Sequence, residues 1–228
     1  MFAIAGALFV ASSTVGGSGD IRVDTTGGLR DAISVRAENV AQLQAEVNDL
    51  TAVVEAQRAQ SDPGPALAAT QAQIDALAPA VGLTEVIGPG VRVTLNDATP
   101  PDPLPDGFTN DDYVVHQQDV QGVVNALWRG GASGVTVMGQ RLVSTSAVRC
   151  VGNTVILQGR VFSPPFVIEG VGDTGALLTA LDQDDSVGIF REWVDLVGLG
   201  YQQQALPRLV LPPYTGPLAP QYADAVRG

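Results

Sequence analysis

Lysine is absent from this chain of 228 residues, and all twelve basic residues are arginine. Chemistry that needs a lysine, such as Schiff-base formation or the phosphate-binding lysine of a P-loop, is therefore excluded. Cysteine and histidine occur once each, as Cys150 and His116, so neither an intrachain disulfide nor a cysteine-rich metal site can form. Few nucleophile–base pairs remain, and we predict no catalytic residues, no metal site, no cofactor and no enzymatic activity.

Positive charge is scarce relative to negative charge. The 24 acidic and 12 basic residues give a formal net charge of −12. Nucleic acids and anionic lipid surfaces are bound by clustered cationic side chains, so neither is an expected partner of the folded part. The length allows one domain of ordinary size plus extensions.

Residues 1–17 contain no charged side chain and are mostly apolar. This length is at the short end of the range for a membrane-spanning helix. A secretory signal peptide is the alternative, but such peptides begin with basic residues, and none is present. We favour a membrane anchor, incomplete at its upstream end, followed by a flexible Gly-Gly-Ser-Gly tether.

A heptad pattern dominates residues 18–62, which we interpret as tether and coiled coil. The a positions hold Ile33, Val40, Val47 and Val54, and the d positions hold Leu29, Leu43 and Leu50. β-Branched residues at a with leucine at d favour parallel two-stranded coiled coils. The alternative is an amphipathic helix packed on its own domain. The pattern predicts a homo-oligomer.

Residues 63–206 read as an α+β domain, and residues 207–228 as a proline-rich C-terminal strand and tail. Helices are predicted at 66–81, 115–131, 173–181 and 187–197. Strands are predicted at 85–87 and 91–95, joined by a tight turn at Gly88-Pro89-Gly90. Further strands are expected at 135–138, 148–151, 154–157, 165–170, 201–205 and 209–211.

Several runs of sequence resemble the YlxW-like family of Gram-positive bacteria, a family of unknown function common in actinobacteria. They are GPGVRVTLND at 88–97, DVQGVVNALWRGGA at 119–132, GQRLVSTSAVRCVGNT at 139–154 and SPPFVIEGVG at 163–172. The resemblance implies a single-pass envelope protein with its domain outside the cell, linked to cell division or cell-wall assembly. It also implies a ferredoxin-like two-layer domain with extra strands.

Within the family-like run at 139–154, Arg141, Arg149 and Asn153 are the candidate partner-binding residues. We expect them to line a surface that receives a carboxylate or a peptide backbone from a partner. The alternative is that the two arginines form internal salt bridges in an acidic domain. A His116–Cys150 dyad lacks any surrounding thiol-hydrolase signature.

Two functions follow as expectations. The first is a non-enzymatic structural or interaction protein of the cell envelope, which self-associates through the coiled coil and contacts other envelope or division proteins. The second is an extracytoplasmic sensor domain that binds a small ligand or peptide. Both place the chain in the cell membrane with its C-terminal domain extracytoplasmic.

Overall fold

The computed structural model describes residues 21–60, 64–151 and 153–216. The chain divides into two units, Met1–Val53 and Val54–Gly228. The described part of the first unit is helical and belongs to helix α2, Ile21–Gln60. The predicted anchor at residues 1–17 lies outside the described residues. Within the part that is described, no helix is long and apolar enough to span a membrane.

The second unit is an α+β domain in which two antiparallel sheets combine with helices. Its helices are α3 Pro65–Leu77, η1 Asn110–Tyr113, α4 Gln117–Arg129, α5 Thr174–Asp182 and α6 Asp185–Val197. Its strands are β1 Val86–Asn96, β2 Gly134–Val137, β3 Gln140–Arg141, β4 Arg149–Val151, β5 Thr154–Leu157, β6 Arg160–Phe162, β7 Phe166–Val171 and β8 Gly200–Leu211.

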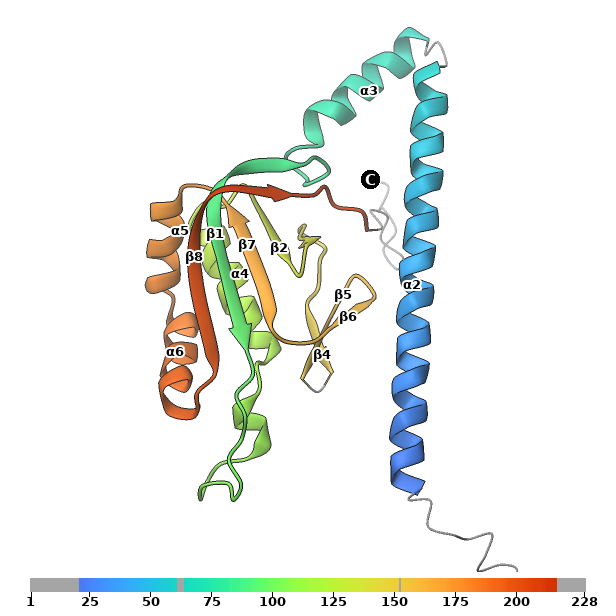
Figure 1. Ribbon diagram of the computed structural model, residues 1–228. Helices are drawn as coiled ribbons and strands as arrows, with labels where there is room; N and C mark the ends of the chain where they lie inside the picture. Colours follow the sequence, from blue (N-terminus) through green and yellow to red (C-terminus); the bar gives the residue numbers. More distant parts are fainter. Residues whose placement is uncertain (1–20, 61–63, 152, 217–228) are drawn as a thin grey trace, which may run out of the picture. The chain divides into compact units, whose positions relative to one another are not determined.

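The larger sheet has the strand order β3-β2-β7-β1-β8, and every neighbouring pair is antiparallel. Helices α4, α5 and α6 cover one face of this sheet (Figure 1). Strand and helix alternate along the chain, first as β1–α4–β2 and then as β7–α5–α6–β8. Between these two halves of the sequence, strands β4, β5 and β6 form a separate small sheet.

The core lies between the large sheet and its helices. On β1 the buried positions alternate, with Val91, Val93 and Leu95 facing inward, as expected for a strand with one buried face. Helix α4 contributes its apolar stripe, and the small sheet adds Val155 and Leu157 to the same core.

The predicted turn at Gly88-Pro89-Gly90 is wrong, because β1 runs continuously through it. The register of β1 against β8 shifts between Gly88 and Gly90, and Pro89 stands at that irregularity. A proline inside a strand is tolerated at such a place. Gly90 lies against the backbone carbonyl of Gly170 on β7, where a Cβ atom would not fit. Gly90 therefore allows β1 and β7 to approach closely and does not form a turn.

The two extended segments predicted at 201–205 and 209–211 form one strand, β8, that passes through Pro207. Strands β3 and β6 were not predicted, because each is only two or three residues long. The helix predictions agree more closely with the structure. Helix α4 ends at Gly130, and Asp173 caps α5 by accepting a hydrogen bond from the Ala176 amide at 2.8 Å.

Candidate functional site

Arg141 occupies a short edge strand whose position is set by a tight turn. β2 and β3 pair through Val137 and Gln140, so Met138 and Gly139 form a two-residue hairpin loop. Both loop residues have positive φ, 51° and 74°, as hairpin loops of this length require. The turn directs the chain back along β2 and places Arg141 opposite Thr136.

The side chain of Arg141 is buried, with 3% of its surface exposed. Its Nη1 donates hydrogen bonds to the carbonyl oxygens of Thr84 and Pro212, both at 3.3 Å. A Cβ atom at Gly134 would lie 2.8 Å from Cζ of Arg141, so this glycine leaves the space that the guanidinium fills. The side chain thus joins β3 to the segments before β1 and after β8.

The guanidinium of Arg141 lacks a counter-ion in the part of the chain that the structure describes, since its partners there are carbonyl oxygens. Its Nε is buried and has no hydrogen-bond acceptor there. Burial lowers the pKa of Arg141 below its ordinary value, because desolvation disfavours the charged form. Burying a charged group without an ionic partner is costly, which sets this guanidinium apart.

A pocket of about 370 Å³ is lined in part by Arg141. Its walls are the turn at residues 79–82, Trp128 from α4, Ser133, and residues 141–144. A second hollow of about 360 Å³ lies along α4 and shares Trp128, Leu142 and Val143 with the first. Trp128 is 41% exposed, so a large aromatic surface separates two hollows and remains accessible from both.

The structure does not gather the three predicted partner-binding residues at one place. Arg149 is exposed on β4 of the small sheet. Asn153 is also exposed, and its Nδ2 donates to Oδ2 of Asp97 at 3.3 Å. No hydrogen bond or ion pair joins any two of the three, all of which are described. Arg141 alone lines the pocket, and it is held by carbonyl oxygens rather than by a salt bridge.

No hydrogen bond joins His116 and Cys150, both of which the structure describes. The His116 Nε2 is 3.8 Å from a carboxylate oxygen of Asp111, whereas the Cys150 amide donates to the Oε1 of Gln117 at 3.3 Å. Burial raises the pKa of the Cys150 thiol, which keeps it protonated and weakly nucleophilic at neutral pH.

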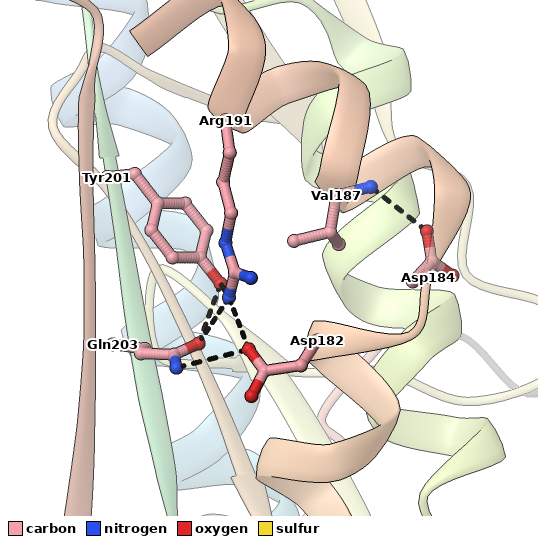
Figure 2. Close-up of polar contacts among 6 residues, drawn as sticks. All are labelled: Asp182, Asp184, Val187, Arg191, Tyr201 and Gln203. Carbon is pink, nitrogen blue, oxygen red and sulfur yellow. Dashed lines mark hydrogen bonds and ion pairs between the residues drawn. The ribbon is translucent and has the colours of Figure 1, made fainter. Parts of the chain in front are cut away.

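A second polar centre, around Arg191 on α6, escaped the sequence reasoning (Figure 2). Nη2 of Arg191 donates to Asp182 at 2.7 Å, to Gln203 at 2.9 Å and to the Tyr201 hydroxyl at 3.1 Å. The Tyr201 hydroxyl in turn donates to Oε1 of Gln203 at 2.9 Å. This network ties α6 to β8 and the end of α5, and its polar groups satisfy one another.

The acidic residues of the run at 182–185 have two separate structural roles. Asp182 pairs with Arg191, as Figure 2 shows, whereas Asp184 is buried and caps α6 through the Val187 amide at 3.0 Å. The second oxygen of Asp184 pairs with Arg129 at the end of α4. Helix α6 begins at Asp185, directly after Asp184, and an aspartate just before a helix is the sequence signal for such a cap.

The antiparallel sheets and the helices that cover one face make this protein an α+β domain. The chain belongs to the family of bacterial proteins of unknown function (DUF881), whose family model matches residues 73–224. The resemblance to YlxW-like proteins is thereby confirmed.

Two curated relatives illustrate the family. UPF0749 protein YlxW from Bacillus subtilis is 38% identical over 102 residues, which cover 45% of this chain and 43% of that protein. UPF0749 protein Rv1823 from Mycobacterium tuberculosis is 28% identical over 164 residues, covering 70% of this chain and 51% of that protein. The chain therefore spans about half the length of the curated relatives it matches.

A solved structure shares the fold. The crystal structure of an uncharacterized conserved protein from Mycobacterium tuberculosis superposes with a TM-score of 0.50 at 24% sequence identity. The match covers 68% of this chain and 99% of that one. At this identity the likeness concerns the fold alone.

Proposed function

We propose that this protein is a non-enzymatic interaction protein of the bacterial cell envelope. It self-associates through α2 and displays the α+β domain on the extracytoplasmic side of the membrane. The observation that carries this proposal is the apolar heptad seam of α2, whose described side chains are largely exposed in a single chain.

Along α2, Leu43, Val47, Leu50 and Val54 expose 60, 51, 58 and 46% of their surfaces. These residues occupy consecutive a and d positions, so they lie on one stripe of the helix. Burial of one aliphatic side chain contributes roughly 1.5–3 kcal/mol. A second copy of α2, aligned in parallel, would cover the whole stripe at once. A helix of 40 residues is about 60 Å long and offers several heptads to this contact.

The envelope location rests on sequence. Residues 1–17 are uncharged and apolar, and they precede the tether and α2. The proposed topology is single-pass, with partners among envelope, division or cell-wall proteins. A reporter enzyme active only outside the cytoplasm, fused after residue 228 of the full chain, tests it. Activity in intact cells is expected, and an inactive fusion of normal abundance would contradict the topology.

We further infer a ferredoxin-like architecture for the domain. The strand order supports this: counting only β1, β2, β7 and β8, the chain runs strand-helix-strand-strand-helix-strand with spatial order 2-3-1-4 and antiparallel neighbours throughout. Strand β3 and the small sheet are then additions to that plan.

Disulfide cross-linking tests self-association on the full chain, purified in detergent. In a Cys150→Ala background, Val47→Cys places a thiol at an a position, and Ala52→Cys places one on the opposite, f position. A parallel pair predicts rapid dimer formation for Val47→Cys and little for Ala52→Cys. A monomer by sedimentation at tens of micromolar, with no cross-linking at residue 47, would reject the coiled coil.

The second candidate function is an extracytoplasmic sensor that binds a small ligand or peptide and reports through α2. The specific observation that favours it is the pocket beside Arg141.

A further inference from the structure

The most unusual charge in the domain is the guanidinium of Arg141. Each of the other arginines with an ion pair among the described residues, Arg92, Arg129 and Arg191, has a carboxylate partner and a side chain at least one-third exposed. Arg141 is 3% exposed and has only carbonyl partners there. A protein with a net charge of −12 therefore buries one arginine without using any of its described carboxylates to neutralise it.

The walls of the pocket at Arg141 combine this charge with apolar surface. Trp128 and Val81 expose 41% and 50% of their surfaces, and both line the pocket. Leu142 and Val143 extend the apolar wall toward the second hollow along α4. An aromatic and aliphatic wall with a few convergent polar groups is typical of ligand sites.

We propose that this pocket binds a carboxylate that carries an apolar group beside it, with Arg141 as the counter-ion and Trp128 as the apolar wall. Peptide C-termini and short-chain fatty acids share this chemistry. The inference rests on the second candidate function, the ligand sensor, and does not depend on self-association through α2.

The chemistry of the guanidinium favours an anion with paired oxygens, such as a carboxylate, over a neutral or cationic ligand. A planar guanidinium matches the two oxygens of a carboxylate, and hydrogen bonds between charged groups are stronger than those between neutral groups. The unused Nε–H of Arg141 is a donor for such a group, once the side chain turns toward the pocket. A cationic ligand would be repelled by the same charge.

Arg141 also has a structural role, because it links the carbonyl groups of Thr84 and Pro212. If this were its whole role, substitution would change stability and leave the pocket without preference between charged and neutral ligands. Selectivity for a carboxylate over the matching amide is therefore the measurement that separates binding from structure.

Tryptophan fluorescence provides the readout, because the chain has only Trp128 and Trp193. In the full chain with Trp193→Phe, the tryptophan emission comes from Trp128 alone, and the Arg141 and Val81 variants assign a change to the pocket. The probes are N-acetyl-valyl-leucine and its C-terminal amide, with hexanoate and hexanamide as the second pair. Hydrogen bonds to charged groups contribute about 1.5–3 kcal/mol, so the carboxylates should bind roughly 10- to 150-fold more tightly than the amides.

Variants of the pocket locate the selectivity. Arg141→Met should equalise the affinities of acid and amide, with folding checked by circular dichroism. If that variant does not fold, Val81→Glu and its control Val81→Gln test whether the pocket binds the carboxylate. Residue 81 is half exposed, so we expect either polar side chain to leave the fold intact. Val81→Glu should weaken carboxylate binding at least several-fold relative to Val81→Gln and leave amide binding unchanged.

The outcomes are distinct. Binding of the dipeptide acid but not of hexanoate identifies a peptide C-terminus as the ligand, and binding of both identifies a small carboxylate. An absence of saturable change with any acid, equal affinities for acid and amide, or equal effects of Val81→Glu and Val81→Gln would overturn the inference. Carboxylate binding that leaves cross-linking at residue 47 unchanged would support the pocket and reject the sensor.

Discussion

Arg92 and Glu169 face each other across the antiparallel strands β1 and β7, and Arg92 donates to one Glu169 oxygen from both Nε and Nη2, at 2.8 and 2.7 Å. The other oxygen of Glu169 accepts from the Thr136 hydroxyl at 3.4 Å on β2. Three adjacent strands are thus connected by side chains on the sheet face opposite the core.

Removal of this pair should have a measurable but modest effect. Opposite charges facing each other across strands contribute about 0.2–1 kcal/mol, and Arg92 is partly solvent-exposed. A double-mutant cycle with Arg92→Met and Glu169→Gln, followed by urea denaturation, should give a coupling energy in that range. The coupling should shrink in 1 M salt, and a coupling of zero at low salt would show that the contact has no energetic role.

Two aspartates cap helices in the same way but differ in burial, which makes them a matched pair. Asp184 is buried, caps α6 and pairs with Arg129, whereas Asp173 is exposed and only caps α5. Loss of a cap is worth about 1 kcal/mol, so Asp173→Ala should lower the free energy of unfolding by about that amount. Asp184→Ala should lower it by about 2–3 kcal/mol, since it leaves the buried Val187 amide unpaired and also removes the ion pair with Arg129.

Asp184→Asn separates the two contributions, because the amide oxygen can still cap α6 while the ion pair with Arg129 is lost. Its free energy of unfolding should lie between those of the wild type and Asp184→Ala. Equal effects of Asp173→Ala and Asp184→Ala, measured by urea denaturation, would contradict the role assigned to burial.

The glycines of β1 allow a similar comparison. At Gly90 a Cβ atom would meet the backbone carbonyl of Gly170, which cannot move without disturbing β7. At Gly88 the nearest atom is Cγ1 of Val171, 3.0 Å away on a side chain that can rotate. Gly90→Ala should lower the free energy of unfolding by about 3 kcal/mol and the melting temperature with it. Gly88→Ala should lower the free energy of unfolding by less than about 1 kcal/mol. Equal melting temperatures would show that Gly90 does not determine the strand spacing.

Local signals predicted part of this fold. Helix α4 follows from its apolar stripe and the glycine at its end, and α5 follows from the capping Asp173. The prediction at Gly88-Pro89-Gly90 was wrong because the local pattern is that of a turn, whereas the structure has a continuous strand there. The close contact with Gly170, 80 residues later, decides its conformation.

The candidate site was predictable only in outline. Arg141 follows Gly139 by two residues in the sequence, but its burial depends on the pairing of β3 with β2 and on contacts with Thr84 and Pro212. The network around Arg191 requires α6 to lie on β8, which no local pattern reveals.

The carboxyl group of Asp119 provides a test by pH. It accepts a hydrogen bond from the His116 amide at 2.7 Å at the start of α4. Burial raises its pKa above the ordinary value of 3.8, and the hydrogen bond and the charge of His116 offset only part of that effect. The native state therefore binds this proton more tightly than the unfolded state does.

The sign of the effect follows from this difference. The contribution of Asp119 to stability is fully present below the unfolded pKa and is lost as the pH rises through the higher, folded pKa. Asp119→Asn keeps an acceptor for the His116 amide but does not titrate. Its free energy of unfolding, relative to wild type, should increase as the pH rises from below 3.8 through the folded pKa of Asp119 and then level off. Asp75→Asn, at an exposed position of α3, controls for the loss of one negative charge. Parallel pH profiles for wild type and Asp119→Asn would show that burial does not perturb this carboxyl group.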